Sequence, residues 1–208
     1  FYADQVHLLD HSVGFRMNGK TRVAIPVLGQ HNVLNALLAS AAASCFGVKP
    51  DDVKERMATF EAPKGRLRYQ ETDGIHWIDD SYNSNPSSLK AAIALFRSYP
   101  PKGRKILALG DMLELGPQAN AFHREAGLQI ADYPFDLVLT VGQLGQRFAA
   151  EAASAGFAKE KIRTFATSQE AGEFLKDQLK PDDTVLLKGS RGMKMERVME
   201  ACGARKAA

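Results

Sequence analysis

The sequence has 208 residues, of which 45% are hydrophobic and 25% charged, and its formal net charge at pH 7 is +3. This length predicts one complete domain with a smaller one beside it, and the composition is that of an ordinary globular protein. The mild charge, with Lys and Arg spread along the chain, argues against nucleic-acid binding, and the absence of a long apolar run argues against membrane insertion.

The N-terminal residues and the cysteines indicate the cellular compartment. The first residues lack the basic and apolar regions of a signal peptide, so we expect a cytoplasmic protein. Cys45 and Cys202 stand alone, outside any CxxC or Cys/His cluster, which predicts neither a disulfide framework nor a zinc site.

Residues 1–64 are predicted to form the smaller part. Over residues 1–27, short alternating runs flank Asn18-Gly19, a pattern typical of a β-hairpin. Residues 32–46 are rich in Ala and Leu at helical spacing and predict a buried helix closed by Gly47. A short helix is expected from Asp51 to Phe60, and the break at residues 63–65 places the domain boundary between residues 64 and 65.

Residues 65–208 alternate between predicted strands and helices. Strands are predicted over residues 75–78, 105–109, 137–141, 162–165 and 184–187, and helices over 87–98, 119–131, 144–153, 169–179 and 194–202. This alternation, with apolar strands, predicts a Rossmann-like, doubly wound α/β domain with a mostly parallel sheet. Ligands of such sheets bind beyond the carboxyl ends of the strands, so the loops there are the candidate sites.

One string imitates a phosphate-binding loop. Residues 14–21, Gly-Phe-Arg-Met-Asn-Gly-Lys-Thr, satisfy the Walker A expression. A Walker loop must open a helix, whereas Thr21 leads into an alternating run that ends at Pro26. We therefore predict a hairpin turn at Asn18-Gly19 rather than an ATP site.

Two carboxamides open the Ala-rich helix. Asn32 and Asn35 are three residues apart and should share one helix face, where paired amides can bind an adenine edge. The alternative is that Asn32 only caps the helix.

Polar residues crowd the loop after the strand at residues 75–78. Residues 79–86 read Asp-Asp-Ser-Tyr-Asn-Ser-Asn-Pro, more polar groups than solubility requires of a loop. Asp80 is the strongest candidate functional residue. An Asx-type turn and helix cap would explain Asn85-Pro86 without any ligand.

Two further loops follow predicted strands. In residues 110–116, Glu114 and the later His123 lack metal-ligand spacing and are expected to orient the loop. In residues 187–196, Lys188, Arg191 and a helix start favour a bound anion, although a solvated basic cap is the alternative. Ser190 has no GxSxG context, so a nucleophilic serine is not expected.

Four of these segments together resemble the Mur ligase family. They are Gly-Gln-His-Asn-Val-Leu-Asn-Ala at residues 29–36, Ile-Asp-Asp-Ser-Tyr-Asn-Ser-Asn-Pro at 78–86, Gly-Asp-Met-Leu-Glu-Leu-Gly at 110–116, and Lys-Gly-Ser-Arg at 188–191. Their order and spacing fit along the whole chain. The second and fourth are the more discriminating, and they favour the branch of the family that adds D-alanyl-D-alanine.

The resemblance implies a domain organisation and a set of ligands. Residues 1–64 would be the C-terminal end of a central ATP-binding domain and residues 65–208 the C-terminal domain, with the phosphate loop and most ligands of Mg²⁺ lying upstream. Asn32 and Asn35 would approach the adenine of ATP, Arg66 its phosphates and Asp80 its ribose. The acceptor or the acyl-phosphate end of the substrate would be faced by Lys188, Ser190, Arg191, Tyr82, Asn83 and Asn85.

The implied reaction joins D-alanyl-D-alanine to a UDP-N-acetylmuramoyl-tripeptide through an acyl phosphate, with Arg66, Asp80 and Lys188 as the residues on which catalysis depends. The resemblance implies a monomer that is inactive without the upstream part. Three alternatives stand beside this interpretation: a non-catalytic nucleotide-binding module, a Mur ligase that adds another amino acid, and a dinucleotide-dependent oxidoreductase. The last lacks GxGxxG after an early strand.

Overall fold

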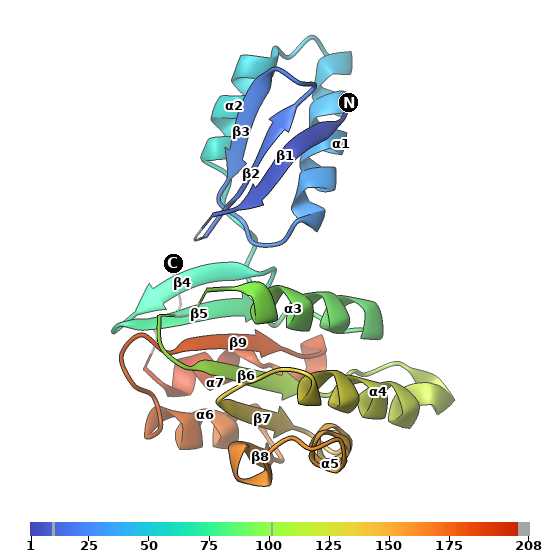
Figure 1. Cartoon of the computed structure of the whole chain (residues 1–208), viewed down its shortest axis with the longest axis vertical. Coiled ribbons are helices and arrows are strands. Elements are labelled where there is room, and N and C mark those ends of the chain that lie inside the picture. The colour runs from blue at the N-terminus through green and yellow to red at the C-terminus, as the bar shows by residue number, and fades with distance from the viewer. Residues whose placement is uncertain (10, 101, 204–208) are drawn as a thin grey trace. The chain divides into compact units, whose positions relative to one another are not determined.

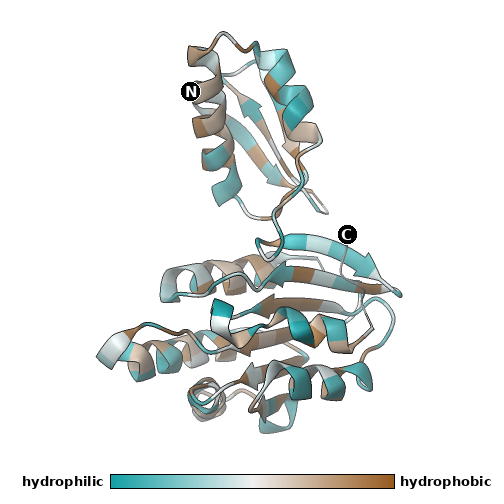
Figure 2. Cartoon of the chain, turned by 180° about the vertical axis from the view of Figure 1, so that it is seen from behind, coloured by the Kyte–Doolittle hydropathy of each residue, from teal (hydrophilic) through white to brown (hydrophobic). Residues whose placement is uncertain are grey.

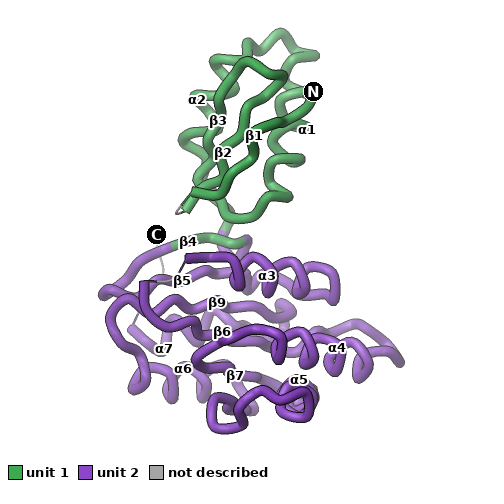
Figure 3. Tube along the Cα trace, viewed as in Figure 1, with its two compact units in different colours: residues 1–63, 67–69 green, residues 64–66, 70–208 purple. Residues whose placement is uncertain are grey.

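The structure, a computed structural model, describes residues 1–9, 11–100 and 102–203. The chain divides into two compact units, drawn in green and purple in Figure 3. Unit 1 comprises residues 1–63 and 67–69, and unit 2 comprises residues 64–66 and the chain from residue 70 onward. None of the helices in the described residues combines the length and apolar character needed to cross a bilayer.

Unit 1 begins with a three-stranded antiparallel sheet, whereas the sequence predicts a single hairpin. Its strands are β1 (Ala3–Leu8), β2 (Val13–Met17) and β3 (Thr21–Ile25), in that order. The prediction did not separate β1 as a third strand. Its alternating apolar residues Val6 and Leu8 are both exposed, so the alternation marks no buried face. Its register with β2 also shifts between Asp4 and His7, beside Gln5 at φ +50°.

The Walker-like string forms the turn of a hairpin, as predicted. Strands β2 and β3 pair antiparallel on either side of it. Asn18 and Gly19 both have positive φ, +51° and +68°, and the Lys20 N–H donates to Met17 O at 3.1 Å. A strand follows the Lys-Thr pair where a phosphate loop would need a helix.

Helices α1 (His31–Cys45) and α2 (Pro50–Ala58) complete unit 1 (Figure 1). Gly47, with φ +79°, lies just after α1 and ends it as predicted. The prediction that α1 is buried is wrong, because only Val33, Ala36 and Ser40 are buried in it.

The opposite side of α1 exposes apolar residues. Leu34 and Leu38 are 61% and 62% exposed, and Ala42 continues the row at the same spacing of four residues. We call these three residues the α1 stripe. The described chain thus covers one side of a helix that is apolar on both sides, and such helices are normally buried.

The larger sheet has six strands in the order β4-β5-β9-β6-β7-β8. They are β4 (Arg68–Thr72), β5 (Ile75–Asp80), β6 (Lys105–Gly110), β7 (Leu137–Val141), β8 (Ile162–Phe165) and β9 (Thr184–Lys188). The five strands from β5 to β8 across the sheet run parallel. The predicted doubly wound, mostly parallel α/β fold is therefore confirmed.

Strand β4 is missing from the sequence prediction. Its residues are polar and none of them is buried, and Figure 2 shows it in teal and white at the edge of a sheet whose inner strands are brown. Asp73 and Gly74, both at positive φ, form the two-residue turn that joins it to β5. Such a short connection requires antiparallel neighbours.

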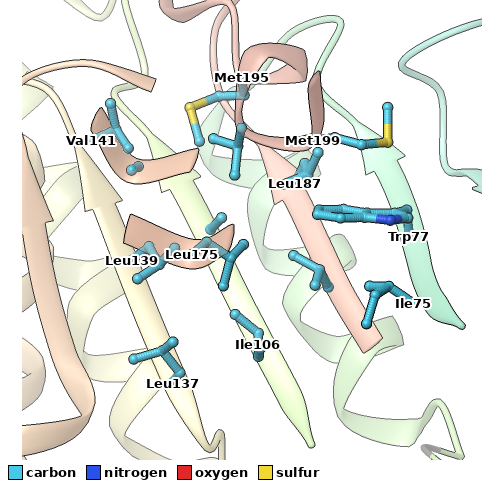
Figure 4. Close-up of a cluster of buried hydrophobic side chains, with 14 residues drawn as sticks. Ile75, Trp77, Ile106, Leu137, Leu139, Val141, Leu175, Leu187, Met195 and Met199 are labelled. Atoms are coloured by element: carbon cyan, nitrogen blue, oxygen red, sulfur yellow. The ribbon is translucent and has the colours of Figure 1, made fainter. Parts of the chain in front are cut away.

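Helices cover both faces of this sheet (Figure 1). They are α3 (Pro86–Ser98), α4 (Ala119–Ala131), α5 (Gly145–Ser154), α6 (Ser168–Lys176) and α7 (Glu196–Ala201). In the cluster of Figure 4, Trp77, Leu139 and Leu187 of the strands pack with Leu175 of α6 and Met199 of α7. The opposite face is covered by α3, α4 and α5, and each sheet face is closed by helices as a parallel sheet requires.

Each unit carries one cysteine, and both thiols are free. Cys45 at the end of α1 is exposed. Cys202 is partly buried and lies 3.5 Å from Gly172 O, and burial raises the pKa of its thiol to about 12. The Cys202 thiol therefore carries very little thiolate at neutral pH.

Truncating the core beneath α6 should destabilise unit 2. Leu175 is fully buried, so Leu175→Ala should lower the free energy of unfolding by about 2–5 kcal/mol. Urea titration followed by the fluorescence of Trp77, the single tryptophan, measures this change. Leu128→Ala, at a position 46% exposed on α4, is the matched control and should shift stability by no more than about 0.5 kcal/mol. Equal losses in the two variants would contradict this description of the core.

Candidate functional site

Four loops meet at the carboxyl edge of the parallel sheet. Asp80 ends β5 and pairs in register with Lys188 of β9, and Lys188 pairs in turn with Leu109 of β6. The Asp111 N–H donates to Val141 O at 3.1 Å, which connects the ends of β6 and β7. We call residues 81–85, 111–115, 142–144 and 189–194 the strand-end site.

Two of the predicted catalytic residues contact each other directly. Lys188 Nζ lies 2.6 Å from Asp80 Oδ2, with side chains 2% and 13% exposed. The ammonium also donates to Asn83 O at 3.1 Å. A buried ammonium is tolerated only when it is paired and hydrogen-bonded, and this geometry meets both conditions. Lys188 thus fixes the start of the loop that follows β5.

Ser190 connects three of the loops. Its Oγ accepts a hydrogen bond from the Leu113 N–H at 2.8 Å and donates to Ser84 O at 3.3 Å. Its own N–H donates to Asp111 O at 3.0 Å. The residue is 4% exposed, so its hydroxyl is engaged within the protein and joins the loops after β5, β6 and β9.

Other predicted residues present accessible groups. Arg191 is 65% exposed at the side chain and forms an ion pair with Glu196 at 2.9 Å. Tyr82 is 47% exposed, and the Arg66 guanidinium carbon lies 4.2 Å from the centre of its ring. Such a stack holds a guanidinium in place while leaving its N–H groups available.

The two asparagines of the loop after β5 make local hydrogen bonds. Asn85 accepts from the Ser88 N–H at 2.8 Å while its own N–H donates to Ser88 Oγ, which forms a capping box at the start of α3. The cap that was the alternative explanation for Asn85-Pro86 is therefore present. Asn83 Oδ1 accepts from the Ser84 N–H at 2.8 Å, and this residue is exposed.

In unit 1, the two predicted adenine-binding amides lie on one face of α1, as predicted. Asn35 Nδ2 donates to Asn32 Oδ1 at 3.0 Å, and Asn32 Nδ2 donates to Leu28 O at 2.8 Å. The helix begins at His31 with Gln30 at the N-cap position, so the alternative that Asn32 caps the helix is wrong. Asn35 is exposed on the helix.

His123 orients the loop after β6, as predicted. It is fully buried, Nε2 accepts from the Met112 N–H at 3.0 Å, and Nδ1 lies 2.7 Å from Ala119 O. This pattern requires the proton on Nδ1, which donates to the carbonyl. Glu114 has a φ of +63° in the same loop.

Two buried aspartates at the strand ends escaped the sequence prediction. Asp79 is 6% exposed and accepts from the N–H groups of Gly65 and Ser81. Asp111 is 4% exposed, and its Oδ2 accepts from the Leu144 N–H at the start of α5 at 3.1 Å. The signal for both is an acid directly after the apolar residues of a strand, where a carboxylate can accept backbone N–H groups of the neighbouring loops.

The described residues contain no group of three or more His, Cys, Asp or Glu side chains that could hold a metal ion. Oxygen-rich clusters of this kind are what a divalent cation such as Mg²⁺ requires from protein ligands.

The fold and these loops define a class of protein, the doubly wound α/β domains that bind ligands at strand ends. The particular family follows from a sequence model of the "Mur ligase, glutamate ligase domain", which matches residues 65–191, more than half of the chain. The chain belongs to the Mur ligase family, as its motifs indicate.

Relatives with known names specify the similarity. The chain is 40% identical over 177 residues to the UDP-N-acetylmuramoyl-tripeptide–D-alanyl-D-alanine ligase of Bacillus subtilis. The matched residues cover 85% of this chain and 38% of that protein. A crystal structure of MurF from Acinetobacter baumannii is 31% identical with a TM-score of 0.86, covering 96% of this chain and 44% of that one. MurF from Thermotoga maritima, solved in complex with ADP, shares the fold at 22% identity and a TM-score of 0.77, covering 96% and 45%. The chain therefore spans less than half the length of these relatives.

Breaking the buried ion pair from one side should be costly. Lys188→Met removes the ammonium that pairs with Asp80 and should lower the free energy of unfolding of unit 2 by about 3 kcal/mol. Adding Asp80→Asn should recover part of that loss, because it removes the carboxylate charge that Lys188 balanced. The exposed pair offers a matched control, since Arg191→Met should change stability by less than about 1 kcal/mol. Similar losses in the two single variants would contradict the burial argument.

Asp111 should make stability depend on pH in a defined direction. Burial is the main cause that raises the pKa of Asp111 above its ordinary value, so the folded state holds this proton more tightly than the unfolded chain. Its contribution to stability is present at low pH and is lost as pH rises through the folded-state pKa. Asp111→Asn cannot ionise, so the stability of the variant relative to wild type should increase between about pH 4 and pH 7. Urea titrations at both pH values measure this difference, and a decrease would contradict it.

Proposed function

We propose that this chain is the C-terminal part of an ATP-dependent peptide ligase that adds D-alanyl-D-alanine to a UDP-N-acetylmuramoyl-tripeptide in peptidoglycan synthesis. The observation that carries the proposal is the 40% identity, over 85% of this chain, to the Bacillus subtilis enzyme whose name states that reaction. The discriminating motifs at residues 78–86 and 188–191 lie together at the strand-end site, which adds a common location to the sequence similarity.

The nucleotide proposal assigns roles in each unit. In unit 2, the exposed and stacked Arg66 guanidinium would bind phosphates, and Asp80 would accept hydrogen bonds from ribose hydroxyls. In unit 1, the linked amides of Asn32 and Asn35 would contact adenine. ATP would supply the phosphoryl group that activates a carboxylate of the substrate, and the Arg66 guanidinium would stabilise the negative charge on that group.

The acceptor proposal rests on which groups are accessible. The carboxylate of a dipeptide would bind the guanidinium of Arg191, and the dipeptide would make polar contacts with Tyr82 and Asn83. The polar atoms of Lys188 and Ser190 already bond to the loops, so they would act on the acceptor mainly by holding those loops in place. Asn85 would contribute in the same way, through the start of α3.

The metal proposal places Mg²⁺ outside the described residues. ATP-dependent phosphoryl transfer requires a divalent cation, and the described part of the chain offers no cluster of ligands for it. We propose that its protein ligands come from the rest of a longer protein. Use of ATP and a nucleotide-linked substrate favours a cytoplasmic location.

The domain proposal concerns unit 1, which we assign to the end of a central ATP-binding domain, with residues 65–208 forming the C-terminal domain. The α1 stripe supports this assignment, because exposed Leu34 and Leu38 would be covered if further chain packed on α1. The chain spans less than half the length of the relatives described above, which agrees with the proposal that it is part of a longer protein.

The test compares this chain with the longer protein that contains it. The 208-residue chain should release no phosphate from ATP in the presence of Mg²⁺, UDP-linked tripeptide and D-alanyl-D-alanine. The longer protein should release phosphate only when both substrates are present. In that protein, Arg66→Ala and Asp80→Ala should each lower kcat/KM by roughly 10- to 1,000-fold, the range for losing one charged transition-state contact.

Arg56→Ala, at an exposed position in the last turn of α2, is the control and should leave the rate unchanged. Turnover by the 208-residue chain alone would overturn the proposal that it is a part of the enzyme. Unchanged rates in both site variants would remove the residue assignments, and nucleotide binding without ligation by the longer protein would favour a non-catalytic binding module.

A further inference from the structure

We infer that Asp79 is a positioning residue, which fixes the backbone of Gly65 so that Arg66 is presented at the carboxyl end of β5. The inference that Asp79 holds this segment rests on contacts within unit 2, and its consequence for ligation rests on the proposed function of Arg66.

Asp79 directs its carboxylate to backbone groups on two segments. Oδ2 accepts from the Gly65 N–H at 3.1 Å, and Oδ1 accepts from the Ser81 N–H at 3.0 Å. Adjacent strand residues point to opposite faces, so Asp79 faces Gly65 while Asp80 faces Lys188. A carboxylate that is 6% exposed must have such donors, and here they join the segment before β4 to the loop after β5.

Gly65 is required by this arrangement for two reasons. Its φ of +73° is accessible to glycine without strain. Its carbonyl accepts from the Tyr82 N–H at 3.0 Å, and a Cβ at this position would lie 2.7 Å from the Tyr82 nitrogen. Gly65 therefore lies directly against the end of β5, with its N–H bonded to Asp79 in that strand and its carbonyl bonded to Tyr82 in the loop that follows.

Arg66 follows as the next residue and is oriented by the same loop. Its guanidinium stacks on Tyr82 at 4.2 Å, and Leu67 beyond it has a φ of +50°. Positive-φ residues on both sides of Arg66 define an unusual backbone path, which depends on fixed neighbours to persist. Asp79 supplies that fixed point from the end of a buried strand.

The first experiment measures amide hydrogen exchange in the 208-residue chain without ligand. Asp79→Asn keeps the shape of the side chain but turns one acceptor into an NH₂ donor that must face an N–H. Exchange at Gly65 or Ser81 should accelerate roughly 3- to 10-fold, as expected for one lost hydrogen bond. Asp177→Asn, at an exposed position after α6, is the matched control and should leave both amides unchanged. Unchanged exchange at both amides in Asp79→Asn would overturn the inference.

The second experiment is a double-mutant cycle in the longer protein. Asp79→Asn should lower kcat/KM for ATP about tenfold or more in the wild-type background and have little further effect in an Arg66→Ala background. Gly65→Ala, which disturbs the same contact from the other side, should reproduce the effect of Asp79→Asn and its dependence on Arg66.

The outcomes separate this inference from the proposed function. If Arg66→Ala does not impair ligation, the proposed role of Arg66 fails, while the exchange experiment still decides whether Asp79 holds Gly65. If Arg66→Ala impairs ligation and Asp79→Asn adds its full effect in that background, Asp79 does not act through Arg66 and the inference is overturned.

Discussion

The burial of the Lys188 ammonium is the constraint on which the strand-end site depends. An ammonium that is 2% exposed must have an anion within reach, and the parallel pairing of β5 with β9 brings Asp80 opposite it. The pair fixes the chain at the point where β5 becomes a loop, and the bond from Lys188 to Asn83 O extends this control into the loop. Ser190, two residues later on the same segment, adds bonds to the loops after β5 and β6. One short sequence thus organises three strand ends.

Two buried carboxylates also fix the backbone of the loops, because they accept hydrogen bonds from backbone N–H groups. Asp111 binds the start of α5, and Asp79 binds Gly65 and Ser81, so each acid joins segments that are distant in sequence. These bonds give a rigid base to loops whose accessible groups, such as Arg191 and Tyr82, remain available to a ligand. The arrangement follows a general rule, in which accessible groups at a site are held by buried partners.

The sequence predicted the α/β fold because apolar strands and amphipathic helices alternate clearly after residue 65. It missed β4, whose polar residues carry no burial signal and which is recognisable only through its pairing and the Asp73-Gly74 turn. It also predicted α1 to be buried, because Ala and Leu occur on both sides of that helix, whereas the described chain covers one side. Periodicity reports what a helix can bury, and only tertiary structure reports what covers it.

For the site, strand-end reasoning predicted functional loops at the carboxyl ends of the strands, and the structure brings the ends of β5, β9 and β6 together. It could not show that Asp80 and Lys188 are partners, since they are separated by 108 residues and meet only through the strand order. It also treated Asp79 and Asp80 as one polar cluster, although the pleat of β5 sends their side chains to different partners. Contacts made through backbone N–H groups have no side-chain signature, which is why neither Asp79 nor Asp111 was predicted as a site residue.

The two thiols differ in exposure, so one of them can be labelled selectively with a spectroscopic probe. Cys202 is protected because burial raises its pKa to about 12, so a maleimide dye at neutral pH reacts preferentially with exposed Cys45. Trp77 lies in unit 2 and Cys45 in unit 1, which gives a donor and an acceptor position without any engineered residue. Energy transfer between the indole and such a dye would report the distance between the two units, and its change on adding nucleotide, in the unmodified sequence.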